Sequence, residues 1–148
     1  MNSQPLARYS AWIRRGDFVF LSGFIAVDPI KKVIIRNFDD LPDGVGKKVG
    51  QTGEFSVDMK DGPILSQSWY IFNQIENTVH EAGGSMKDVF KLVQYFRDLS
   101  DFPRFNSVRK QFFPETPPVS TVLEVSAMMP SAEILVEVEA TAYIPSSS

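Results

Sequence analysis

Apolar residues gather in two runs at the start of the chain. Residues 6–14 and 17–27, which read LARYSAWIR and DFVFLSGFIAV, are rich in aromatic and β-branched side chains and flank Arg15-Gly16. A glycine between two such runs is typical of a tight hairpin turn. We therefore expect two strands, of which 17–27, apolar on both faces, is a central strand covered on both sides.

The middle of the chain predicts two helices. Between residues 66 and 82 apolar side chains recur at three- and four-residue steps, the spacing of a helix with one buried stripe. Ser66 is a suitable N-cap, and Gly83-Gly84 is a suitable stop. Residues 100–113 predict a second helix with Pro103 in its first turn. Strands are expected for the remaining apolar runs, 88–99, 120–128 and 134–144.

Residues 28–64 are irregular, and a short strand at 33–36 and a small hairpin around 54–59 are the only regular elements expected there. A connection this long is usually functional or mobile. The order is then ββ, long loop, α, β, α, β, β, in one domain over 1–148. Strands with two helices on one face form an α+β sandwich. We expect the sheet face without helices to be covered by another copy of the chain in an oligomer.

Composition narrows the possible functions. The 148 residues are 43% apolar, and the net charge of −3 gives no electrostatic case for a nucleic-acid partner. With no cysteine and only one histidine, no metal site is expected. No apolar run approaches the roughly 20 residues of a membrane span, and the N-terminus has no apolar signal core. A soluble, cytoplasmic protein is expected.

The last apolar run carries the strongest candidate for chemistry. Glu137 and Glu139 alternate with valines, so both carboxylates point to one face of a strand, with Glu124 on a nearby strand. A solvated face is the simplest interpretation. However, so apolar a run is typical of burial, and a buried carboxylate is often functional.

A glycine-rich stretch and the histidine are weaker candidates for a functional site. The stretch GVGKKVGQTG at 44–53 does not match a phosphate-binding loop, because Leu41 stands where G-x-x-x-x-G-K-[ST] needs its first glycine. No helix is expected after it either. His80, near the end of the first predicted helix, is expected at the surface.

Several short motifs follow one another along nearly the whole chain. They are YS at 9–10, GDFVFLSG at 16–23, Gln67, AGGSMKDVFK at 82–91, DLSDFPRFN at 98–106, FF at 112–113 and VEVEATA at 136–142. In these motifs the sequence resembles the Rid (YjgF/RidA) family of imine and enamine deaminases. The resemblance implies a chorismate-mutase-like sandwich, with a mixed β-sheet and two helices on one face, assembled as a homotrimer around a central barrel.

The resemblance also implies a function. Small-molecule clefts lie between subunits, where a glutamate and backbone groups position a water that attacks an imine carbon and releases ammonia, with no cofactor. Glu137 is the implied catalytic residue, positioning the water or carrying a proton. The residues expected to bind substrate are Tyr9, Ser22, Gly23, Phe24, Asn106, Val119, Ser120 and Thr121.

The chain departs from the family pattern at PPVST, residues 117–121. The family has Pro-Ala-Arg-Ser there, and its arginine pairs with a substrate carboxylate. The arginine's place falls on Val119 or Ser120. Losing such a charge-assisted bond costs about 1.5–3 kcal/mol, so we expect a substrate other than a simple 2-aminoacrylate-type acid. Arg8 or Arg97 could replace the cation.

Two further departures concern the cleft. Phe24 stands where the family commonly has glutamine, and the 28–64 connection is about 20 residues longer than usual. This long loop is expected to shape or cover the cleft.

Two other functions remain open. A trimer of the same fold could bind or sense a small ligand without catalysis. RNA cleavage or translation inhibition, also named within the family, has little support from an acidic chain with one histidine.

Overall fold

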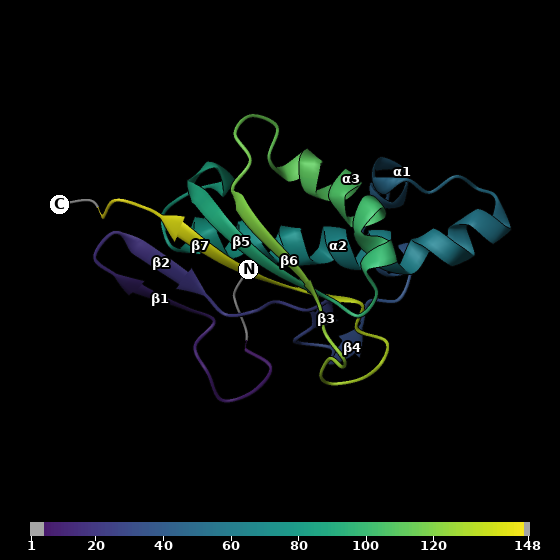
Figure 1. Ribbon diagram of the computed structural model, residues 1–148, viewed down its shortest axis with the longest axis horizontal. Helices are drawn as coiled ribbons and strands as arrows, with labels where there is room; N and C mark the ends of the chain where they lie inside the picture. The colour runs from purple at the N-terminus through teal and green to yellow at the C-terminus, as the bar shows by residue number, and fades with distance from the viewer. Residues whose placement is uncertain (1–4, 147–148) are drawn as a thin grey trace.

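A computed structural model describes residues 5–146; the first four residues and Ser147-Ser148, part of the serine tail, lie outside the described range. Five strands form one sheet in the order β1-β2-β7-β5-β6 (Figure 1). All neighbours are antiparallel except β5 and β6, which are parallel. The strands are β1 (Trp12–Arg15), β2 (Phe18–Leu21), β5 (Val89–Phe96), β6 (Val119–Glu124) and β7 (Val136–Tyr143).

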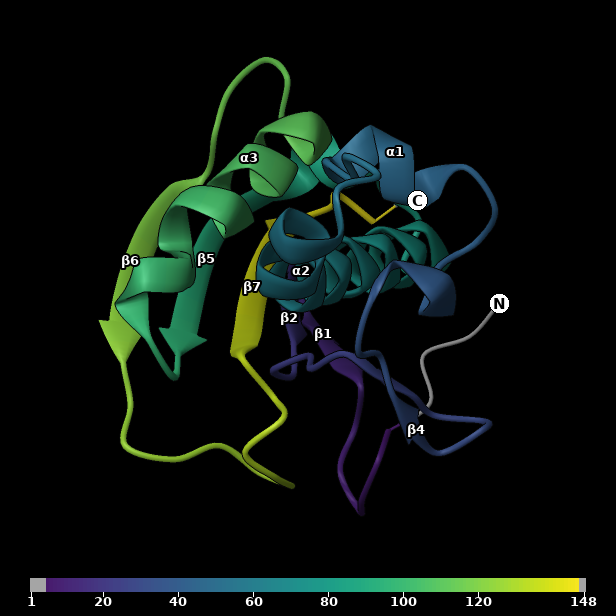
Figure 2. The same cartoon turned by 90° about the vertical axis from the view of Figure 1, so that its right-hand side faces the viewer.

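Two long helices, α2 (Phe55–Glu81) and α3 (Phe102–Phe112), lie against the same face of this sheet (Figure 2). Phe72 of α2 packs on Phe105 of α3, and Phe105 meets Phe96 of β5, with ring centroids 5.4 Å and 4.9 Å apart. On β7 every second residue is buried because the side chains of a strand alternate between faces. The α+β sandwich with both helices on one face is therefore confirmed.

The first long helix starts eleven residues before the predicted position, at Phe55 rather than at 66, so the expected hairpin around 54–59 is wrong. Ser66 is not an N-cap but a fully buried residue inside α2. Gly62 and Pro63 suggest a break in the sequence, yet both lie within the helix. A Cβ on Gly62 would lie 3.3 Å from Phe38 Cε2, so close packing on Phe38 favours a glycine there.

The other predicted boundaries shift less. The C-terminal stop of α2 is confirmed, since Gly83 has φ +95°, a conformation that favours glycine. Pro103 lies in the first turn of α3, as expected. The strands are shorter than the apolar runs that predicted them. Beyond β2, Phe24 continues the pairing with β7 through a bridge to Val138.

The long connection is mostly short regular pieces rather than a loose loop. They are β3 (Val27–Asp28), β4 (Val33–Ile34), the 3-10 helix η1 (Phe38–Asp40) and α1 (Val45–Val49). Two further 3-10 turns, η2 (Met86–Asp88) and η3 (Leu99–Asp101), flank β5. The first turns of α2 complete the connection and project beyond the sheet (Figure 1), leaving Phe55 and Met59 exposed.

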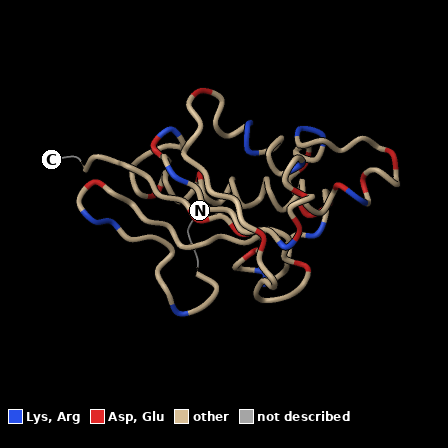
Figure 3. Tube along the Cα trace, viewed as in Figure 1, with Lys and Arg blue, Asp and Glu red and all other residues tan. Residues whose placement is uncertain are grey.

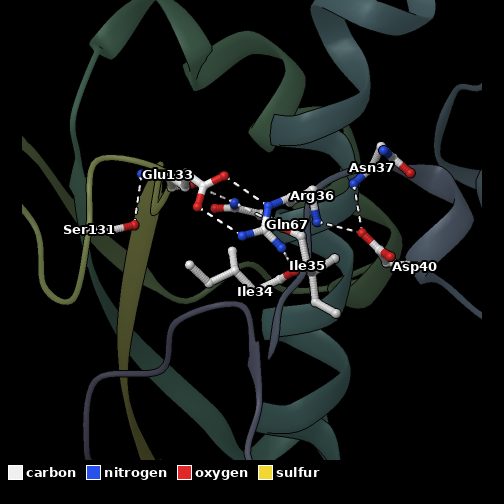
Figure 4. Close-up of polar contacts among 8 residues, drawn as sticks. All are labelled: Ile34, Ile35, Arg36, Asn37, Asp40, Gln67, Ser131 and Glu133. Carbon is white, nitrogen blue, oxygen red and sulfur yellow. Dashed lines mark hydrogen bonds and ion pairs between the residues drawn. The ribbon is translucent and has the colours of Figure 1, made fainter. Parts of the chain in front are cut away.

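Gln67 ties this connection to the segment that precedes β7 (Figure 4). Its buried side chain donates to the carbonyls of Ile35 and Glu133, at 3.0 Å and 2.8 Å, and accepts from Leu135 N at 3.0 Å. An ion pair between Arg36 and Glu133 lies beside it at 2.8 Å. The connection is thus bound to the segment that leads into β7.

The sheet face away from the helices carries large apolar side chains. Phe18 and Phe20 of β2 are 43% and 48% exposed, so in a single chain this strand is covered on one side only, contrary to the expectation. Phe18 contacts Phe90 and Tyr143 edge to face. This surface, here called the open face, is the one that a second copy would have to cover.

Candidate functional site

Glu137 lies directly over the backbone of Gly23. A Cβ placed on Gly23 would lie 2.1 Å from Glu137 Oε2, closer than atoms can approach. Phe24 N donates to Val138 O at 2.8 Å, and Val138 N donates back to Phe24 O at 3.0 Å. This pair of bonds draws the chain after β2 across β7, so a side chain at position 23 would displace the Glu137 carboxylate from its place.

The Glu137 carboxyl group is half-buried on the open face. Burial raises its pKa above the ordinary glutamate value, and repulsion from Glu139 on the same face raises it further. Glu139 in turn accepts a hydrogen bond from Tyr95 OH at 3.1 Å. A carboxyl group with a raised pKa is better suited to exchanging protons near neutral pH than an ordinary glutamate.

Three more predicted site residues lie close to Gly23. Ser22 Oγ donates to Ser10 O at 2.7 Å, which holds the hydroxyl on the neighbouring chain segment. Tyr9, Gly23 and Phe24 line one small cavity of about 40 Å³, next to Gln74 of α2. Phe24 packs against the core rather than on the open face. Tyr9, Ser22, Gly23 and Phe24 therefore lie close together, and Glu137 meets this group at Gly23 from the open face.

The other predicted residues lie at the opposite edge of the sheet, on β6 and α3. Val119 pairs with Lys91 of β5, and its side chain is 66% exposed. Ser120 turns to the helix side, where Gln94 donates to it at 2.8 Å, while Thr121 shares the face of Val119. Of the two places considered for the missing arginine, Val119 is therefore the one on the open face, and Lys91 is its neighbour there.

The strand register separates these two groups within one chain. Glu137 pairs with Tyr95, whereas Val119 pairs with Lys91, four residues earlier on the same strand. At about 3.3 Å per residue this is roughly 13 Å along the strand, with two further strand spacings across the sheet because β5 lies between β7 and β6. A small ligand cannot touch Glu137 and Val119 of the same chain.

Sequence reasoning missed one arginine, Arg109 of α3. Its Nη1 donates to Gln94 Oε1 at 2.6 Å and to Ser120 Oγ at 3.0 Å, and its Nη2 donates to Asn106 Oδ1 at 2.9 Å. Asn106, a predicted site residue, is thus joined to Ser120 through this guanidinium. The available signal was the three-residue spacing from Asn106, which places both on one helix face.

The remaining charged residues considered from the sequence lie away from the contact between Glu137 and Gly23. Arg97 donates to Ala132 O, and Arg8 is exposed near the N-terminal segment. Glu124 accepts from Leu99 N at 3.0 Å. It pairs with buried Phe96, on the face opposite Glu137, so Glu124 does not join the carboxylates of Glu137 and Glu139. His80 is exposed, as predicted.

Charge and hydropathy add two observations about the described chain. Acidic and basic residues are interspersed along the trace of residues 5–146 rather than gathered in one basic segment (Figure 3). Within the same range no helix is both long and apolar enough to cross a membrane.

Comparison with known proteins places the chain in a family. A family model described as endoribonuclease L-PSP matches residues 1–144. A RutC family protein from Pyrococcus abyssi is 31% identical over 140 residues, covering 95% of this chain and 89% of that protein. A 2-iminobutanoate/2-iminopropanoate deaminase from Dermatophagoides farinae is 27% identical over 134 residues, 90% of this chain and 85% of that one.

A comparison with solved structures supports the same family. A Klebsiella pneumoniae protein is 56% identical and superposes with a TM-score of 0.91, over 93% of this chain and 100% of that one. The chain belongs to the endoribonuclease L-PSP family, which includes the RutC and Rid proteins, as its motifs predicted.

Proposed function

We propose that this protein hydrolyses a small imine or enamine, with Glu137 as the catalytic residue. The observation that carries the proposal is the half-buried Glu137 carboxyl group, seated on Gly23 with its pKa raised by burial and by Glu139. One relative is named as a 2-iminobutanoate/2-iminopropanoate deaminase, which supports the reaction class.

The reaction needs only water and a group that moves protons. Water adds to the imine carbon while ionised Glu137 accepts its proton. The protonated carboxyl group then returns that proton to the nitrogen, which gives a carbinolamine. Glu137 next takes the hydroxyl proton of the carbinolamine and passes it to the amino group as the carbon–nitrogen bond breaks, which leaves a carbonyl compound and ammonia. An enamine enters the same path after its carbon is protonated to the imine. No cofactor is part of this path.

The site is proposed to lie between subunits of a homotrimer. One chain holds Glu137 with Gly23 at one place and β6 with Val119 and Thr121 at another, and Val119 is roughly 13 Å from Glu137 along the strands. A second copy docked on the open face could supply the missing half of each cleft. The exposed Phe18 and Phe20 favour such docking, because a large exposed apolar surface usually marks an interface.

The substrate is proposed to differ from a simple imino acid at the end that Val119 contacts. A valine there suits an uncharged group, whereas the family's arginine pairs with a carboxylate. Lys91 is the cation beside Val119 by strand register. It carries a flexible point charge rather than a planar fork, so it is a poorer partner for a carboxylate than arginine.

A non-catalytic trimer that binds a ligand in the same clefts is the alternative, and it is favoured by the valine at the arginine's place. RNA cleavage, suggested by the name of the family model, is less well supported. The net charge is −3 and the only histidine lies at the end of α2, away from Glu137.

Ammonia release from freshly generated imines, compared between wild type and Glu137→Gln, tests the proposal. Saturable ligand binding by calorimetry without any ammonia would favour the alternative.

A further inference from the structure

Arg109 is an unusual cation in this molecule. Its guanidinium is half-buried between α3 and β6, where it donates to the neutral oxygens of Gln94, Ser120 and Asn106. The rings of Phe102 and Phe105 lie against it, 5.3 Å and 5.8 Å from Cζ to the centroids. These contacts fix the plane of the guanidinium.

No carboxylate compensates this charge. The ion pairs between side chains of residues 5–146 are Arg36–Glu133 and Arg104–Asp61, so Arg109 has no partner of this kind within that range. A partly desolvated charge held only by neutral groups is costly. Burial also lowers the pKa of Arg109, although an arginine stays charged at physiological pH.

Part of the guanidinium remains available. Arginine has five N–H donors, and the three bonds above occupy both hydrogens of Nη1 and one of Nη2. Nε–H and the second Nη2–H have no other acceptor within hydrogen-bond distance in the described part of the chain. Two oxygens of one carboxylate or phosphate group are the acceptors that such a pair of donors binds best.

A pocket of suitable size opens at this guanidinium. It measures about 320 Å³ and is lined by Arg109, Asn106, Lys110 and Phe113, with Pro117 and Pro118 on the connection to β6. Sites for small molecules begin at about this volume. Glu115 is the one acidic residue among the described residues of the lining, against two basic ones.

We propose that Arg109 and Lys110 form a binding site for the oxyanion of a small carboxylate or phosphate ligand. The site stands independently of the proposed hydrolysis. Ser120 and Arg109 lie on the helix side of β6, whereas Glu137 lies on the open face. Phe113 and the two prolines would contact the apolar part of the ligand.

The test follows the Nε–H signal of Arg109 by NMR in the full-length ¹⁵N-labelled protein. Acetate and inorganic phosphate are titrated separately, with sodium chloride keeping the ionic strength constant. The signal is assigned by its loss in Arg109→Lys. A saturable shift with acetate identifies a carboxylate site, one with phosphate a phosphate site, and either supports the proposal. Shifts that do not saturate, or that chloride reproduces, overturn it.

Two variants separate a ligand site from a structural role. Arg109→Lys keeps a cationic donor for Gln94 but loses the planar fork, and its thermal unfolding shows whether it folds. It should weaken binding of the oxyanion, followed on the Lys110 backbone amide, by about tenfold or more. Arg104→Gln removes a cation of the same helix that is already paired with Asp61, and it should leave binding unchanged. Equal affinity in wild type and Arg109→Lys would mean that Arg109 only joins α3 to the sheet.

Discussion

Gly23 and Glu137 occupy space that two ordinary residues cannot share, since a Cβ on Gly23 would lie 2.1 Å from Glu137 Oε2. The contact is with the end of a flexible side chain, so Gly23→Ala should move the carboxylate rather than unfold the protein. We expect ammonia release to fall by about tenfold to a hundredfold, because a displaced carboxylate loses part of the roughly 100- to 10,000-fold that a positioned proton-transfer group contributes. The melting temperature should change little.

Gly62→Ala is the matched control for that experiment. The atoms nearest to its Cβ would be those of the Phe38 ring, the first at 3.3 Å, on the helix side of the molecule. It should leave ammonia release unchanged. If Gly23→Ala retains full turnover, Glu137 does not act from the position that the structure shows.

The pH profile should report the environment of Glu137. Its ionised form accepts the proton of water, so turnover should rise with pH through the pKa of Glu137. Because burial and Glu139 both raise this pKa, the acid limb should lie above the ordinary glutamate range. Glu139→Gln removes the repulsion and should move the limb to lower pH. A limb that stays in place would assign the titration to another group.

Gln67 should matter far more to stability than the ion pair beside it. Gln67→Leu leaves the carbonyls of Ile35 and Glu133 and the N–H of Leu135 without their partner. We expect a loss of about 3 kcal/mol in the free energy of unfolding by urea, since each buried polar group left unpaired costs about 1–3 kcal/mol. Arg36→Ala should cost less than about 1 kcal/mol, as exposed ion pairs do. Similar losses for both variants would contradict the role given to Gln67.

The open face should hold the assembly together. We expect wild type to sediment as a trimer, and Phe20→Asp to dissociate it, because the charge would be buried in an apolar interface. Phe55→Asp places the same charge on a residue that is 79% exposed at the projecting start of α2, and should leave the trimer intact. A monomeric wild type, or an intact Phe20→Asp trimer, would contradict this arrangement.

The hydrophobic patterns in the sequence predicted which helices and strands form better than they predicted the residues at which these elements begin and end. The alternation in VEVEATA predicted β7 and the face of Glu137, because a strand with one buried face has an apolar side chain at every second residue. The start of α2 could not be predicted in this way. Gly62-Pro63 usually interrupts a helix, and the packing of Gly62 on Phe38, which overrides this tendency, joins residues far apart in the sequence.

The contacts within the candidate site also could not be predicted from local motifs. The motifs led to Glu137 and Gly23, but their contact depends on the Phe24–Val138 bridge between distant segments. The motifs also grouped Val119 with Glu137, which the register keeps apart within one chain. Arg109 was missed because its partners Gln94 and Ser120 come from two strands that only the fold brings together.

Turnover of a panel of freshly generated imines by wild type and Glu137→Gln tests the central claim most directly. The panel contains matched carboxylate-bearing and neutral members, and trimer content is checked for both proteins. The account predicts ammonia from wild type, with neutral members preferred, and at least a hundredfold less from Glu137→Gln with its assembly intact, at the lower end of what a positioned proton-transfer group contributes. Equal turnover by the two proteins, or no ammonia from an intact wild-type trimer with any member, would contradict it.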